Sequence, residues 1–220
     1  MPARRRASRH TFEPRACALS SHADVSANYV GIRHSRNSGR AVELWLDDKS
    51  GFIEVDMKAL YLIGGTMGVG KTAVGQQLKK DLPNSVFLDG DWCWDADPFQ
   101  ATEETQAMVM RNICYLLNSF LHCTAYENII FCWVMHEQAI IDSIIDRLNT
   151  DDCRVKRISL TADETNLRKR LSSDIARGIR TEDVIERSLA RIYMYSALDT
   201  VKVDTSNKTI CGIADELIAL

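Results

Sequence analysis

The chain has 220 residues, 45% of them hydrophobic, and a formal net charge of -3 at pH 7. This size and composition predict one folded domain with a possible extension, and the weak net charge argues against nucleic acid or a membrane surface as the partner. No apolar stretch is long enough to cross a bilayer. The seven cysteines form no C-x-x-C pair, which favours buried thiols in a reducing, cytoplasmic compartment over a zinc site.

Residues 1–56 differ in composition from the rest of the chain. Residues 1–40 contain eight arginines but only two acidic residues, and they show no hydrophobic periodicity. Such a composition buries too little apolar surface to offset the chain entropy lost on folding. Three interpretations are open: an organelle transit peptide, a basic arm for nucleic acid, or a segment outside the functional protein. Residues 42–46 and 52–55 are compatible with a short hairpin.

The functional domain is predicted to begin at Met57. This methionine is followed by one lysine and by an apolar run at residues 59–63, which has the pattern of a buried strand. The interpretation of residues 1–56 as a segment outside the functional protein is therefore favoured. Residues 1–56 are expected to be a disordered or non-native extension, and residues 57–220 the functional domain.

A glycine-rich loop follows the first strand of that domain. Residues 65–72 fit the phosphate-binding pattern G-x-x-x-x-G-K-[ST], and residues 73–80 have the composition of a helix. With no side chains at the glycines, backbone N–H groups turn inward around an anion, and the helix adds the positive end of its dipole. Lys71 supplies a mobile charge for the β- and γ-phosphates of a nucleotide, and the Thr72 hydroxyl a ligand for magnesium. The predicted nucleotide-binding residues of this loop are Gly65, Thr66, Met67, Gly68, Val69, Gly70, Lys71 and Thr72.

The alternative for this stretch is a glycine-rich turn with an incidental Lys-Thr pair. A true phosphate-binding loop requires a strand before it and a helix after it. Both are predicted here, so the nucleotide-binding interpretation is preferred.

Strands and helices alternate through the rest of the chain. Residues 85–88 form a predicted strand that ends in Asp89-Gly90-Asp91, and a long helix with its N-cap at Thr102 follows. The apolar run at 128–134 is typical of a strand covered on both faces. The remaining predicted elements are helix 136–149, strand 154–160, a helix from 161 that stops at Gly178, helix 181–198, strand 200–203 and helix 209–220.

This alternation predicts an α/β fold with a five-stranded parallel sheet and helices on both faces. Ligands of such sheets bind at the carboxyl ends of the strands. The glycine-rich loop and the Asp-Gly-Asp turn both follow strand ends. The site is therefore expected to combine these two segments.

Residues 57–220 resemble the nucleoside/nucleotide-kinase branch of the P-loop proteins, which includes shikimate kinase, gluconate kinase, adenylylsulfate kinase, chloramphenicol phosphotransferase and the tunicamycin-resistance protein. The resemblance implies a three-layer sandwich with strand order 2-3-1-4-5, and an ATP- and magnesium-dependent kinase. It also implies that Thr205 borders the nucleotide. The motifs that carry it are the loop at 65–72, Asp89-Gly90-Asp91, Leu160-Thr161-Ala162 with Leu167-Arg168-Lys169-Arg170-Leu171, and Val203-Asp204-Thr205-Ser206.

The sequence departs from this branch at the end of the third strand of the predicted sheet. Cys132-Trp133-Val134 provides neither the aspartate of a Walker B motif nor the glycine triplet of shikimate kinase. Magnesium is therefore expected to depend on Thr72, the phosphates and Asp89. Shikimate is not the expected acceptor.

The resemblance also suggests the catalytic residues. Asp91 is the predicted general base, which orients and deprotonates the acceptor hydroxyl; the alternative is a turn aspartate that caps the next segment. Kinases of this branch place a lid arginine on the transferring phosphoryl group. Arg177 and Arg180, on either side of the helix break at Gly178, are the preferred candidates, with Arg170 or Arg187 next. Lys71 completes the predicted catalytic set.

Three tryptophans follow strand ends on the expected ligand side: Trp92, Trp94 and Trp133. Aromatic rings at such positions can stack on a planar substrate, and plain packing is the alternative.

The predicted function is therefore transfer of the γ-phosphate of ATP to a hydroxyl of a small molecule. The alternative is a regulatory ATPase that binds nucleotide without such transfer. A GTPase would show N-K-x-D after the fourth strand, and a hydrolytic motor would show a Walker B acid; neither is present. Nucleosides, sugars and antibiotics remain open as acceptors.

Overall fold

The computed structural model describes residues 32–34, 41–46, 49–54 and 57–220. The chain forms two compact units, Met1–Ile53 and Glu54–Leu220, so that the second begins close to the predicted start at Met57. In the first unit, β1 (Ile32–His34), β2 (Ala41–Leu46) and β3 (Lys49–Glu54) form a sheet in the order β1-β2-β3, with β1 antiparallel to β2. The hairpin predicted within 42–55 corresponds to β2 and β3. The rest of residues 1–56 lies outside the described residues, and the interpretation of this segment as a disordered or non-native extension stays a prediction.

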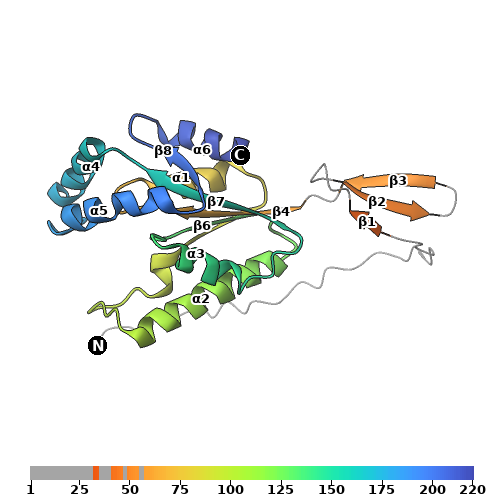
Figure 1. Cartoon of the computed structure of the whole chain (residues 1–220), viewed down its shortest axis with the longest axis horizontal. Helices are drawn as coiled ribbons and strands as arrows, with labels where there is room; N and C mark the ends of the chain where they lie inside the picture. The colour runs from red at the N-terminus through yellow and green to blue at the C-terminus, as the bar shows by residue number, and fades with distance from the viewer. Residues whose placement is uncertain (1–31, 35–40, 47–48, 55–56) are drawn as a thin grey trace, which may run out of the picture. The chain divides into compact units, whose positions relative to one another are not determined.

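The second unit alternates strands and helices along the chain, as Figure 1 shows. Within the described part of the chain, no helix is long and apolar enough to cross a membrane. The elements are β4 (Lys58–Gly64), α1 (Lys71–Asp81), β5 (Ser85–Asp89), α2 (Glu103–His122), β6 (Asn128–Cys132), α3 (Gln138–Ile145), β7 (Cys153–Thr161), α4 (Glu164–Ala176), α5 (Val184–Ile192), β8 (Val201–Asp204) and α6 (Ile210–Ala219), with 3-10 turns at Gly90–Cys93 and Tyr193–Ala197.

The five strands of this unit form one parallel sheet in the order β5-β6-β4-β7-β8. Numbered along the unit, this order is 2-3-1-4-5, which confirms the predicted α/β fold. β4 is the central strand, with Leu60 opposite Ile129 of β6 on one side and Val155 of β7 on the other. Its carboxyl end therefore carries the phosphate loop at the middle of the sheet.

Alternate side chains of β4 enter two separate cores. Leu60 and Leu62 pack with buried residues of α2 and α3, whereas Tyr61 and Ile63 pack with residues of α1, α4 and α6. This division follows from the two-residue period of a strand, and it places helices on both faces of the sheet (Figure 1). The predicted three-layer sandwich is thereby confirmed.

Local capping explains where two of these helices begin and end. Thr102 and Thr105 form a reciprocal cap at the start of α2: Thr102 Oγ1 accepts from the Thr105 N–H at 3.2 Å, and Thr105 Oγ1 accepts from the Thr102 N–H at 2.9 Å. α4 ends where Gly178 adopts a φ of 70° and donates its N–H to Ile175 O at 2.8 Å. Both ends agree with the sequence prediction.

The helix predicted over 181–198 is wrong in one respect, because the structure divides it into α5 and a 3-10 turn. Val184 belongs to the core beneath α1, α4 and α6, whereas Tyr195 and Leu198 belong to the core beneath α2 and α3. One straight helix cannot reach both faces of the sheet. The break lets the chain pass from one core to the other.

The second unit is expected to fold and bind nucleotide without residues 1–56. A chain that starts at Met57 retains every strand of the parallel sheet and both of its cores. ATP at 100 times its dissociation constant should stabilise this shorter chain by about 2.7 kcal/mol, as it does the full chain. Thermal unfolding of both chains, with and without ATP, measures this. A shorter chain that is unfolded, or that shows no ATP-induced shift, would contradict the prediction.

Candidate active site

The phosphate loop connects β4 to α1 and is shaped by its glycines. Gly65, Gly68 and Gly70 have φ values of 150°, 83° and 103°. A Cβ at Gly65 would lie 2.8 Å from Leu160 O, so only glycine fits there. α1 begins at Lys71, and its first N–H groups face the loop. The structure therefore brings the predicted nucleotide-binding residues 65–72 into one loop at a helix N-terminus.

Lys71 is held inside this loop. Its Nζ donates to Thr66 O at 3.1 Å. Burial lowers the pKa of Lys71, the carboxylates of Asp89 and Asp91 oppose that shift, and the positive charge of Arg180 adds to it. These four side chains thus share one electrostatic environment, in which phosphate oxygens would supply further negative charge beside Lys71.

A second cluster lies where β5 and β6 end side by side. Asp89 is paired with Cys132 in the register of these strands and is 7% exposed. Asp89 Oδ2 accepts from Thr72 Oγ1 at 2.8 Å and from Cys132 Sγ at 3.4 Å. A carboxylate of β5 thus lies directly beside the hydroxyl of the phosphate loop, whereas the neighbouring strand β6 ends in Cys132 and carries none.

Thr72 and Asp89 form an oxygen donor set that suits magnesium, which prefers oxygen ligands and retains several waters. Within residues 57–220 and the described strands before them, no group of three or more His, Cys, Asp or Glu side chains is arranged to hold a metal. The donor set thus fits an ion that also depends on phosphate oxygens and water.

Replacing Asp89 with asparagine is expected to raise the magnesium concentration needed for half-maximal ATP turnover by about 10-fold or more. The amide keeps the shape of the side chain but loses the charge beside Thr72. A magnesium titration of ATP turnover measures this, with Asp95→Asn, an exposed change in the same connection, as the control. An unchanged magnesium requirement would remove Asp89 from the metal site.

Asp91 lies two residues further, in the turn Gly90–Cys93. Its backbone N–H donates to Asp89 Oδ1 at 3.2 Å, and its Oδ1 accepts from Trp133 Nε1 at 3.1 Å. Asp91 is exposed on one side, but partial desolvation by the surrounding site raises its pKa, and the charge of Asp89 raises the pKa further. Gly90 makes this arrangement possible, because a Cβ there would lie 2.5 Å from Trp133 Cγ. Asp91 is thus a fixed carboxylate with increased basicity.

The predicted lid arginines are separated by the structure. Arg180 lines the same cavity as Lys71 and Asp91, and its Nε lies 3.3 Å from Asp174 Oδ2. Arg177 caps the end of α4, is exposed, and lies outside the residues that line this cavity. Only one of the two preferred candidates is therefore brought to the site.

α5 adds two further arginines to the cavity, Arg187 and Arg191. They are four residues apart and therefore lie on one helix face. Thr66 Oγ1 donates to Ser188 O at 3.1 Å, which holds this helix against the phosphate loop. Arg187 was a secondary candidate from the sequence and Arg191 was not singled out. Their spacing on an amphipathic helix is the signal that indicates both.

Arg170 and Thr205 both contact the phosphate loop at the backbone oxygen of Val69. Arg170 Nη1 donates to Thr205 Oγ1 at 3.0 Å and to Val69 O at 3.4 Å. Thr205 is fully buried, and its hydroxyl lies 3.1 Å from Val69 O and 2.9 Å from Thr161 O. Protein groups thus bind the Thr205 hydroxyl and both terminal nitrogens of Arg170. These bonds hold Thr205 against the phosphate loop, and its position beside the nucleotide stays a prediction.

A cavity of about 730 Å³ opens beside the loop, which is a volume typical of small-molecule sites. Its lining includes Lys71, Thr72, Asp89 and Asp91. It also includes residues of the connection after β5, of α2 and its surroundings, and of the segment from Trp133 into α3. The residues of this second group are Trp94, Phe99, Ala101, Gln106, Val109, Met110, Trp133, Val134, His136, Glu137 and Ile140.

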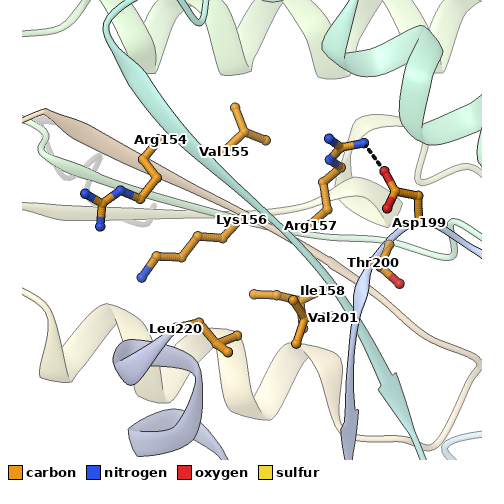
Figure 2. A pocket seen from close by; sticks show the side chains of 9 residues that line it. All are labelled: Arg154, Val155, Lys156, Arg157, Ile158, Asp199, Thr200, Val201 and Leu220. Carbon is orange, nitrogen blue, oxygen red and sulfur yellow. Dashed lines mark hydrogen bonds and ion pairs between the residues drawn. The ribbon is translucent and has the colours of Figure 1, made fainter. Parts of the chain in front are cut away.

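Figure 2 shows a different pocket, of about 460 Å³, along the amino-terminal half of β7. Two of its charged side chains bind other protein groups: Arg157 Nη1 lies 2.8 Å from Asp199 Oδ2, and Lys156 Nζ donates to Tyr61 Oη at 3.1 Å. It contains no residue of the phosphate loop. The residues of the phosphate loop therefore line the larger cavity and not this one.

Comparison with known proteins agrees with this geometry. The AAA domain family matches residues 62–193, more than half of the chain. A shikimate kinase of Bacillus cytotoxicus is 27% identical over 171 residues, which cover 74% of this chain and 97% of that protein. The length of that protein is thus close to the length of this chain's second unit.

Two solved structures show the same fold. The tunicamycin resistance protein of Deinococcus radiodurans has a TM-score of 0.57 at 18% identity, and the match covers 74% of this chain and 94% of that one. A gluconokinase from Sinorhizobium meliloti 1021 has a TM-score of 0.55 at 17% identity, covering 74% and 91%. With the phosphate loop, the strand order and these relatives in agreement, the chain belongs to the AAA domain family, in its branch of P-loop small-molecule kinases, and is an ATP-dependent kinase.

Proposed function

We propose that residues 57–220 transfer the γ-phosphoryl group of ATP to a hydroxyl of a small organic acceptor. The observation that carries this proposal is the position of Asp91. Asp91 lines a cavity of about 730 Å³ together with Lys71 and Thr72 of the phosphate loop, and its carboxylate accepts a hydrogen bond from Trp133. A protein that only hydrolyses ATP needs room for a water molecule, whereas this cavity has room for an acceptor.

Each side chain has a role that follows from its place. The N–H groups of the loop and Lys71 bind the phosphates. Thr72 and Asp89 would hold a magnesium ion, which neutralises charge on the β- and γ-phosphates when bound. Asp91 orients the acceptor hydroxyl and accepts its proton. Arg180 lines the cavity and would act on the phosphoryl group that moves, with Arg187 and Arg191 as further cationic groups of the same lining.

Shikimate is the first acceptor to test, because the curated relative of 27% identity is a shikimate kinase. The structure argues against it. Trp133 packs on Gly90 at the acceptor side of Asp91, where the shikimate kinase pattern has glycines. We therefore propose a different acceptor.

The direct test is transfer of labelled γ-phosphate from ATP to members of a metabolite and antibiotic panel, with shikimate and gluconate included. The proposal expects at least one phosphorylated product whose formation requires magnesium. ATP hydrolysis without any phosphorylated product across the panel favours the regulatory ATPase instead.

The compartment proposed is the cytoplasm. Cys93, Cys114, Cys123, Cys132, Cys153 and Cys211 are free thiols, and no disulfide forms among the described residues. Free thiols are the usual state in a reducing compartment, which supports the proposal.

A further inference from the structure

The lining of the cavity contains two chemically different groups of side chains. Lys71, Asp89 and Asp91 are charged groups in and beside the phosphate loop. The remaining lining includes the polar Gln106, His136 and Glu137, but its larger part is formed by apolar and aromatic side chains: Trp94, Phe99, Val109, Met110, Trp133 and Ile140. We call Trp94, Phe99 and Trp133 the aromatic wall.

The rings of the aromatic wall form one continuous row. The ring of Trp94 meets that of Phe99 at a centroid distance of 4.8 Å and that of Trp133 at 6.1 Å, with interplanar angles of 82° and 75°. Both contacts are edge-to-face, and all three residues line the cavity. Phe99 remains 58% exposed.

The aromatic wall is hydrogen-bonded directly to Asp91, the proposed general base. Trp133 donates its indole N–H to Asp91 Oδ1 at 3.1 Å, so one ring of the wall lies beside the carboxylate. Asn112 of α2 donates to Cys93 O at 3.0 Å and holds the turn that carries Asp91 against the helix behind the wall. A molecule on the wall would thus lie within reach of Asp91.

Charge is distributed unevenly around this cavity. Arg180 is paired with Asp174, and Arg187 with Asp183 at 2.8 Å. These arginines come from α5 and the segment before it, not from the aromatic wall. Gln106, His136 and Glu137 also line the cavity, but the rings of the aromatic wall offer few hydrogen-bond partners, so hydroxyls of a polyol placed against those rings would be left without one, which is costly.

We propose that the acceptor is an alcohol carried by a planar ring, with the ring on the aromatic wall and the alcohol oxygen at Asp91. This inference rests on the proposed function and specifies its substrate class. In the transfer, the alcohol proton goes to Asp91 and a bond forms between the alcohol oxygen and the γ-phosphorus. The bond between that phosphorus and the β–γ bridging oxygen breaks, and ADP leaves.

The test separates binding from transfer. The full chain is saturated with a non-hydrolysable ATP analogue, and binding is measured by calorimetry for two ring alcohols, uridine and 2-phenylethanol, and for two non-aromatic acids, gluconate and shikimate. Transfer of labelled phosphate from ATP to the same four compounds is measured separately. We expect at least one ring alcohol to bind more tightly than both acids and to be phosphorylated.

Variants of the aromatic wall test where the ring of the acceptor binds. Trp94→Ala and Phe99→Ala should each weaken binding of the ring alcohol by about 10-fold, the usual scale of one aromatic stacking contact, and leave ATP affinity unchanged. Trp92→Ala is the matched control, because Trp92 lies in the same turn but contacts Phe87 and does not line the cavity. An equal loss in Trp92→Ala would overturn the placement of the ring.

The outcomes distinguish the two proposals. Ring alcohols that bind but receive no phosphate would support the aromatic subsite and contradict phosphoryl transfer to them. Phosphorylation of gluconate or shikimate without binding of either ring alcohol would overturn the ring inference and leave the kinase function standing. Failure of both ring alcohols to bind would overturn the inference as well.

Discussion

Replacing Arg180 with alanine is expected to slow phosphoryl transfer by ~10³-fold or more, the scale of an arginine that stabilises a transferring phosphoryl group. Arg180 lines the cavity beside the phosphate loop, and its charge acts on Lys71. The effect should appear in kcat, because Arg180 meets the negative charge that develops on the phosphoryl group only in the transition state. ATP affinity should fall far less. Single-turnover rates and ATP binding measure the two effects.

Arg177→Ala is the matched control for this experiment. It removes the same charge three residues earlier, at an exposed position outside the cavity. We expect near-normal transfer from it. Thermal unfolding of both variants accounts for the ion pair between Arg180 and Asp174 that Arg180→Ala also removes. A slow Arg177→Ala variant beside a normal Arg180→Ala variant would assign the lid arginine to Arg177.

Asp91→Asn is expected to lower transfer roughly 10²–10⁴-fold, the range of a general base. The amide keeps the shape of the carboxylate beside Trp133 but cannot accept the proton of the acceptor. ATP binding and the fold should be unchanged, which calorimetry and circular dichroism check. A folded variant with nearly unchanged ATP turnover would favour the regulatory ATPase, because hydrolysis requires no acceptor to be deprotonated.

The pH dependence of the wild-type chain gives a second measure of the same carboxylate. A general base acts when it is deprotonated, so transfer should fall as the pH falls through the pKa of Asp91. Burial and the charge of Asp89 raise that pKa above the usual value of about 3.9. The acid limb of the pH–rate profile should therefore lie above that value and disappear in Asp91→Asn.

The sequence alone was sufficient to predict the fold and the phosphate loop, because both depend on local patterns. The apolar run at residues 59–63 and the glycine, lysine and threonine spacing of residues 65–72 lie within single short segments. Alternation of strands and helices then permits few arrangements, because parallel strands need crossover connections. The sequence likewise indicated that Asp89 and Asp91 follow a strand on the ligand side.

Only the tertiary structure decided which distant residues share the site. The register of β5 on β6 places Asp89 beside Cys132, and a hydrogen bond across 42 residues joins Trp133 to Asp91. Arg180 enters the cavity and Arg177 does not, because Gly178 turns the chain between them. Such proximity depends on how strands pair and how helices end in three dimensions, and no local period or spacing in the chain encodes it.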